Sequence, residues 1–208
     1  MLESAPVKET ILVVGSLNMD FVVSVEQLPV PGATVPGHSF RMIPGGKGAN
    51  QAVAAARLGG RVSMVGRVGN DVFGERLRAS LEEAGVDTRF VLATEEATGA
   101  ALIFVARGGL NQIVVAAGAN GRLLPADLAG AKPCFADARL ALLQLESPLE
   151  TVAAALEMAR GHGATTVLDP APARPLPPEL LRLVDLLTPN ETEALALRLL
   201  PFEETSGL

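Results

Sequence analysis

The sequence predicts an α/β protein built on a doubly wound, mostly parallel sheet with helices on both faces, together with a small β-sheet flap. Short β-branched apolar runs alternate with helical patterns along most of the chain, as in parallel strands joined by helical crossovers. Other β-rich runs break this alternation and are interrupted by glycine and proline, which favours short strands outside the main sheet. The 208 residues suffice for one large domain with a real core.

The first half of the chain contains the start of the alternation and half of the flap. The expected elements are a strand at 11–14, flap strands at 21–25 and 35–42, a helix at 49–58, a strand at 61–66 and a helix at 71–85. Gly15 and Ser16 close the first strand with a tight turn. The second helix follows from an apolar face that includes Leu77 and Leu81, and Gly85 gives its stop signal.

The second half completes the flap and then resumes the alternation. Two β-rich runs at 99–106 and 112–116 flank a Gly-Gly-Leu-Asn turn, which is a hairpin signal. The elements expected after it are strands at 140–145, 165–168 and 184–187 and helices at 149–160, 178–183 and 191–199. The proline-rich stretch between residues 169 and 178 is a loop within one domain, which we take as residues 1–208.

Composition excludes several classes of protein. With 49% hydrophobic and 19% charged residues and a mean hydropathy of +0.34, the chain is too apolar for disorder, and its apolar runs are too short to span a membrane. A net charge of −6 without Trp or Tyr disfavours nucleic-acid partners. Cys134 has no partner for a disulfide and is assigned a structural role, and residues 1–10 resemble no signal peptide, so a cytoplasmic location is expected.

The most unusual stretch is PGGKGANQ at residues 44–51, which leads directly into a helix. Its glycines let the backbone approach a ligand, and free N–H groups at a helix start suit an oxyanion or a sugar hydroxyl. It is not a phosphate-binding P-loop, because Gly48 rather than Ser or Thr follows Lys47, and it lacks the third glycine of a dinucleotide fingerprint. An ordinary glycine-rich turn is the alternative reading.

Polar side chains follow two predicted strands at their ends. Asn18 and Asp20 come after the first strand and Glu146 after the strand at 140–145, where open α/β sheets bind ligands. A carboxylate and an amide can bind adjacent hydroxyls of a polyol. Turn formation by Asn18 and Asp20, and helix capping by Glu146, are the alternatives.

Asn190 and Glu193 begin the last helix with the spacing of a capping box. His38 and His162 lack the partners of a catalytic triad, and the sequence contains no zinc-ligand or EF-hand spacing, so any metal is expected to arrive with a phosphate ligand.

Six motifs occur in an order that resembles one family. They are VVGSLNMD at 13–20, GGKGANQA at 45–52, GAN at 118–120, QLESP at 144–148, DPAPA at 169–173 and TPNETE at 188–193. Over about residues 10–199 the chain closely resembles the ribokinase/PfkB family of carbohydrate kinases. Members phosphorylate a sugar hydroxyl with ATP and magnesium, and their doubly wound α/β domain carries a β-sheet lid over the sugar.

The resemblance implies transfer of the ATP γ-phosphoryl to the O5 hydroxyl of D-ribose, giving ribose 5-phosphate. Other family members act on other sugars or nucleosides, but the combination of the first, second and fourth motifs favours ribose. By the same resemblance, the residues that bind the sugar are Asn18, Asp20, Gly46, Lys47, Asn50 and Glu146.

The resemblance also places Asn190 near the ATP phosphates and lets Glu193 organise magnesium through water. It assigns the lid to two insertions at about 21–42 and 98–117, and it implies a homodimer contact through that lid.

One departure limits the activity that the resemblance implies. Family members carry a Gly-Ala-Gly-Asp motif, whose Asp is the catalytic base, beyond the Asn-x-x-Glu motif; the sequence has none, and its end, PFEETSGL at 201–208, resembles nothing in the family. The last third of the family fold, with most of the adenine site and the potassium site, is therefore expected to be absent. The chain is expected to be a C-terminally truncated and inactive kinase with no catalytic base of its own, or alternatively a non-catalytic sugar-binding remnant.

Overall fold

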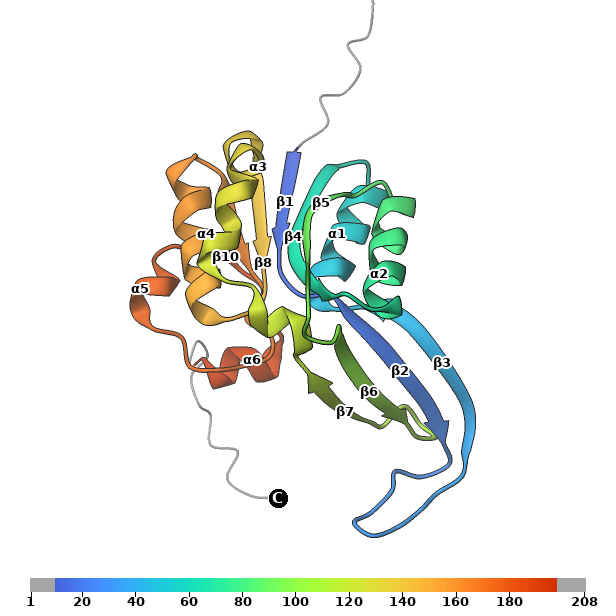
Figure 1. Cartoon of the computed structure of the whole chain (residues 1–208). Helices are drawn as coiled ribbons and strands as arrows, with labels where there is room; N and C mark the ends of the chain where they lie inside the picture. Colours follow the sequence, from blue (N-terminus) through green and yellow to red (C-terminus); the bar gives the residue numbers. More distant parts are fainter. Residues whose placement is uncertain (1–9, 198–208) are drawn as a thin grey trace, which may run out of the picture.

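The computed structural model describes residues 10–197 and contains two sheets (Figure 1). The larger sheet has six strands in the order β10-β9-β8-β1-β4-β5, and every pairing within it is parallel. Its strands are β1 (Thr10–Val14), β4 (Arg61–Gly69), β5 (Asp87–Thr94), β8 (Leu140–Leu143), β9 (Thr165–Leu168) and β10 (Leu186–Leu187). The predicted doubly wound α/β fold is confirmed.

Helices cover both faces of this sheet, as the alternation of side chains along β1 requires. Leu12 and Val14 belong to the core on one face, whereas Val13 belongs to the core on the other. In Figure 1, α1 and α2 lie on one side of the sheet and α3 and α4 on the other. The helices are α1 (Lys47–Arg57), α2 (Val72–Glu83), α3 (Lys132–Asp137), α4 (Leu149–Gly161), α5 (Pro178–Leu181) and α6 (Glu191–Ala196).

The smaller sheet forms the predicted flap and extends beyond the carboxyl ends of the large sheet (Figure 1). Its strand order is β3-β2-β6-β7, with β2 parallel to β6 and the outer pairs antiparallel. At its base the Phe21 ring meets Phe73 of α2 edge to face, with ring centroids 5.3 Å apart. The strands are β2 (Asn18–Val25), β3 (Gly37–Gly45), β6 (Gly99–Val105) and β7 (Asn111–Ala116).

Asp71 starts α2 and ties it to this smaller sheet. Its Oδ1 accepts the N–H groups of Phe73 and Gly74 over 3.0 and 2.8 Å, which satisfies two free donors of the first turn. Its Oδ2 accepts the N–H of Thr98, just before β6, over 2.8 Å. The predicted helix at 71–85 therefore begins one residue later, with Asp71 as its N-cap.

The order of the strands creates a crevice at the carboxyl ends of β1 and β8. From β1 the chain builds β4 and β5 on one side and only later returns to add β8, β9 and β10 on the other. The connections leaving β1 and β8 therefore cross opposite faces of the sheet, and ligands of open α/β sheets bind at such a switch point.

The structure differs from the prediction in the middle of the chain. Strand β5, an edge strand with β4 as its neighbour, was not predicted, because its exposed and buried side chains give only a weak apolar pattern. Between residues 118 and 137 the chain forms two 3₁₀ segments, η1 (Gly118–Arg122) and η2 (Pro125–Ala131), before α3, and elements this short show no periodicity. Residues 198–199 of the last predicted helix and the unusual end at 201–208 lie outside the described residues.

No helix between residues 10 and 197 combines the length and the apolarity that crossing a membrane requires.

Candidate functional site

The carboxylate of Glu146 lies at the centre of the crevice. Ser16, which follows β1, donates its hydroxyl to Glu146 Oε2 over 2.5 Å. The same oxygen accepts the Asn18 side-chain amide over 3.4 Å and the backbone N–H of Lys47 over 3.3 Å. Donors from the segment after β1, from β2 and from the start of α1 thus hold one oxygen of the carboxylate, while no bond to its other oxygen is present among the described residues.

The glycine turn before α1 comes so close to the first strand that side chains do not fit. Gly46 has φ +94°, and a Cβ added to it would lie 2.6 Å from the backbone nitrogen of Asn18. A Cβ on Gly48 would lie 2.7 Å from the nitrogen of Ser16. These glycines are therefore required by a close approach of two backbones, which brings Lys47 beside Glu146.

Asp20 lies on β2 above Gly45, where a Cβ would overlap its carboxylate. Burial, with a smaller contribution from the Glu146 carboxylate, raises the pKa of Asp20 to about 6. Two carboxylates and the Asn18 amide therefore lie close together, an arrangement suited to a ligand with several hydroxyl groups.

Asp169 adds a third carboxylate at the end of β9. Burial raises the pKa of Asp169, whereas the ammonium group of Lys47 acts to lower it. The charges of Glu193 and Glu146 raise this pKa further. The Asn190–Glu193 motif therefore lies near the same end of the sheet as Asp169. Charge from four elements thus meets at the crevice.

Asn190 and Glu193 form the capping box that their spacing predicts. Asn190 donates its backbone N–H to Glu193 Oε2 over 2.8 Å, and Glu193 donates its own N–H to Asn190 Oδ1 over 2.8 Å. The Asn190 side chain also donates to Glu193 Oε1 over 2.9 Å. Both oxygens of Glu193 are therefore engaged in the cap.

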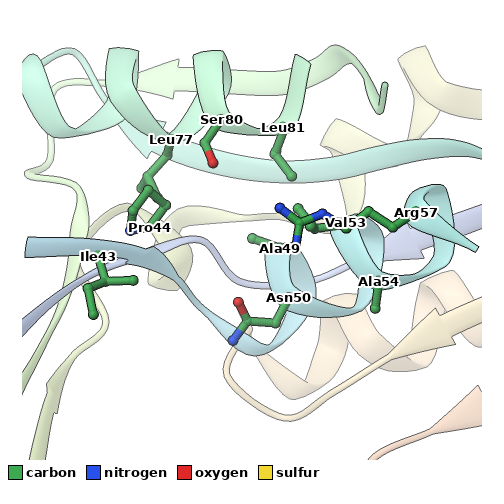
Figure 2. Close-up of a pocket in the computed structure, with 10 residues that line it drawn as sticks. All are labelled: Ile43, Pro44, Ala49, Asn50, Val53, Ala54, Arg57, Leu77, Ser80 and Leu81. Carbon is green, nitrogen blue, oxygen red and sulfur yellow. The ribbon is translucent and has the colours of Figure 1, made fainter. Parts of the chain in front are cut away.

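Asn50 lies one turn into α1, away from the bonds around Glu146. Its exposed side chain borders a groove of about 430 Å³ between α1 and α2. Figure 2 shows its amide toward the end of the groove formed by Ile43 and Pro44 of β3, with Arg57 at the other end. Of the six residues predicted to bind sugar, Asn18 and Lys47 donate hydrogen bonds to Glu146, whereas the Asn50 side chain has no described hydrogen bond to Glu146 or Asp20.

The remaining residues singled out in the sequence lie elsewhere. His38 is on the smaller sheet, with Nε2 3.8 Å from Glu26 Oε2, and His162 follows the last turn of α4. Cys134 is on α3 and is buried in the core. Between residues 10 and 197, no cluster of three or more His, Cys, Asp or Glu side chains could cage a metal.

Three residues that build the crevice were not assigned roles from the sequence. Ser16 braces Glu146, Asn120 binds the segment between β1 and β2, and Asp169 faces Lys47. Asn120 and Asp169 belong to the GAN and DPAPA motifs, so the signal was present, but their partners are far away in the chain. Their roles depend on contacts that only the folded chain makes.

Comparison with known proteins points to one family. Residues 8–206 match the pfkB family carbohydrate kinase. The chain is 45% identical over 185 residues to the ribokinase of Bacillus subtilis, covering 88% of this chain and 63% of that protein. It is 43% identical over 188 residues to the ribokinase of Haemophilus influenzae, covering 90% of this chain and 61% of that protein.

Solved structures agree with this result. A ribokinase of Arabidopsis thaliana complexed with ribose and ATP superposes with a TM-score of 0.85 at 32% identity, covering 96% of this chain and 65% of that one. The ribokinase of Thermotoga maritima gives a TM-score of 0.81 at 36% identity, covering 91% and 62%. The chain thus spans less than two thirds of the length of these relatives. Motifs, fold and sequence similarity together show that it belongs to the pfkB family of carbohydrate kinases.

Proposed function

We propose that this chain is the sugar-binding part of a ribokinase-type kinase, in which the ATP γ-phosphoryl is transferred to the O5 hydroxyl of D-ribose. The observation that carries the proposal is the convergence of Asn18, Asp20, Lys47 and Glu146 at the switch point of the sheet. Its support is the 40–45% identity to ribokinases and the similarity to a ribokinase solved with ribose and ATP.

In this proposal the pocket recognises hydroxyl groups by matching donors with acceptors. Asn18 donates through its amide, while Asp20 and the free oxygen of Glu146 accept. Gly46 lets the turn approach the sugar, and Lys47 offers its ammonium group. Asn50 is included on the family resemblance alone, because its side chain borders the groove between α1 and α2. Burial and the nearby Glu146 carboxylate both disfavour the ionised form of Asp20. A sugar hydroxyl that donates a hydrogen bond to Asp20 offsets part of this cost.

ATP and magnesium would bind beside the sugar, at the start of α6. Asn190 is proposed to lie near the phosphates. Magnesium keeps several water ligands and binds through few carboxylates, so the pair of Glu193 and Asp169 suits a hydrated ion better than a protein cage. Magnesium bound with ATP neutralises the charge of the phosphates during transfer. We also propose a cytoplasmic location, because ATP is available there.

The sequence contains no Gly-Ala-Gly-Asp motif, so the base that the family takes from that motif is not among these 208 residues. General-base help is worth about 10²–10⁴-fold in rate, and the donors of an anion hole add comparable factors. A polypeptide of these 208 residues is therefore expected to bind ribose without measurable turnover. A non-catalytic sugar-binding remnant would behave in the same way.

The smaller sheet is proposed to act as a lid over the sugar and as the contact between two copies of the chain. Its exposed apolar side chains are Phe40, Met42, Leu102, Ile113, Val114 and Val115. So many apolar side chains on one small sheet are unusual at the surface of a monomer.

Calorimetric titration of the purified chain with D-ribose, followed by an ATP-turnover assay, tests the proposal. We expect binding that weakens in Asp20→Ala and is unchanged in Asn70→Asp, a control at an exposed residue between β4 and α2. Binding with turnover would show that a base is supplied elsewhere. Absence of binding in a folded sample would overturn the proposed pocket. Parallel titration with 2-deoxy-D-ribose separates the two sugars, because a relative at 40% identity is the deoxyribokinase of Salmonella typhimurium.

A further inference from the structure

Asn120 is a buried side chain that joins the end of the lid to the start of the pocket. It lies in η1, directly after the last lid strand, and is 2% exposed. Its Oδ1 accepts the backbone N–H of Leu17 over 2.8 Å, and its Nδ2 donates to the carbonyl of Leu17 over 3.0 Å. The same Nδ2 donates to Asn18 Oδ1 over 2.7 Å.

These bonds determine the orientation of the Asn120 amide. A backbone N–H can only donate and a carbonyl can only accept, so Leu17 specifies which atom of Asn120 is oxygen and which is nitrogen. The second proton of Nδ2 must then point at Asn18. Because that position receives a donor, the facing atom of Asn18 must be its oxygen.

The orientation of Asn18 follows from that of Asn120. With Oδ1 turned to Asn120, the Nδ2 group of Asn18 points to the pocket, where it lies 3.4 Å from Glu146 Oε2. Lid strand β6 leaves room for this pair, because a Cβ on Gly99 would overlap both Asn120 Nδ2 and Asn18 Oδ1. A chain of bonds thus runs from the backbone through Asn120 to the pocket.

We propose that Asn120 is a positioning residue that makes Asn18 a pure donor toward the ligand. The inference rests on the proposed sugar site and specifies its chemistry. The ligand oxygen beside Asn18 must accept a hydrogen bond, and its own hydrogen is then free to reach a carboxylate such as Asp20. A hydroxyl group meets both demands, whereas an ammonium or other pure donor at this position cannot accept from Asn18.

The test compares Asn120→Asp with Asn70→Asp, which makes the same chemical change at an exposed residue between β4 and α2, outside the proposed lid. The carboxylate introduced by Asn120→Asp cannot donate, so the Asn18 amide turns its nitrogen toward that carboxylate and its oxygen toward the pocket. Loss of one donor to the ligand lowers D-ribose affinity on the order of tenfold, while Asn70→Asp leaves it unchanged. In an Asn18→Ala background, Asn120→Asp is expected to cause no further loss.

An equal loss of affinity in the Asn18→Ala background would overturn the inference, because it would mean that Asn120 acts only through the stability of the fold. Thermal melting of each variant reports that stability separately. If Asn120→Asp does not fold, Gly99→Ala disturbs the same bond from lid strand β6 and is expected to give the same dependence on Asn18.

A sugar-free measurement separates this inference from the proposed function. In the unliganded chain, the side-chain amide protons of Asn18 are expected to give nuclear Overhauser contacts to the backbone N–H of Lys47, since both groups donate to Glu146 Oε2. Absence of these contacts to the N–H of Lys47 would refute the orientation, because the flipped amide would turn its oxygen to that side. If the wild-type chain fails to bind ribose, the proposed function falls while this spectrum still decides the inference.

Discussion

Acidification through pH 6 should weaken sugar binding through the protonation of a single side chain, Asp20. Burial raises the pKa of this carboxyl to about 6 in the free chain. A sugar hydroxyl donates to the ionised form, so affinity is full above pH 6 and is lost as the pH falls through it. If only the ionised form binds, the apparent dissociation constant at pH 5 is about tenfold larger than at pH 7, since the ionised fraction falls from about 90% to about 10%.

Calorimetric titration with D-ribose between pH 5 and pH 8 measures this dependence. Near pH 6 the binding of ribose should release about half a proton, which appears as a binding enthalpy that depends on the ionisation enthalpy of the buffer. Glu146 and Asp169 also lie at the crevice, so the control is Asp20→Asn, which removes only one titrating group. This variant should bind more weakly at pH 7 but with an affinity that does not change with pH.

A flat affinity between pH 5 and pH 7 in the wild type would refute the reasoning, as would a slope that persists in Asp20→Asn. Unfolding in acid does not imitate the effect. Because the pKa of Asp20 is higher in the folded than in the unfolded chain, the folded state binds more protons, and the contribution of Asp20 to stability rises as the pH falls through 6. Thermal melts at each pH check this directly.

Three further predictions concern other parts of the chain. Gly46→Ala should abolish ribose binding in a titration, because the added Cβ would lie 2.6 Å from the backbone nitrogen of Asn18. Gly59 is the control, since it has a similar φ of +95° but no atom near an added Cβ. Gly59→Ala should cost only about 1–2 kcal/mol of stability and leave binding intact. Asn190→Ala should lose about 1 kcal/mol of stability with the cap and bind ATP more weakly, so unchanged affinity for ATP would leave only the capping role. Arg67→Ala should lose about 2 kcal/mol in urea unfolding, because Asp127, which is bonded to Arg67 at 2.7 Å, keeps only the N–H of Leu124 as a partner. A loss within error would contradict this.

Local sequence patterns were sufficient for most of the fold. Strand β9 has the predicted bounds, and the helix at 149–160 and the hairpin at 99–116 differ from the observed elements by about one residue. These elements carry their signals within a few residues, as apolar runs, glycine stops and turn residues. The order of elements then implied the doubly wound sheet, because parallel strands joined by crossovers have few alternative topologies.

Elements that are short or have a weak apolar pattern were harder to predict from the sequence. Strand β5 has charged residues at Asp87 and Arg89, which pair with each other over 2.7 Å at the surface, so its pattern does not resemble a buried strand. Its position is decided by pairing with β4, which is a long-range contact. The same holds for the turns between residues 118 and 137, where burial of Phe135 rather than local periodicity organises the chain.

By itself, the sequence determined which polar residues follow the strands and that glycine must stand in the turn before α1. Only the tertiary structure decided how these residues act together, because the bonds that orient them join distant segments. Asn120 reaches Asn18 across 102 positions, and Ser16 reaches Glu146 across 130. Which face of an amide points to the pocket depends on donors and acceptors that folding alone brings within about 3 Å, and no local pattern encodes that choice.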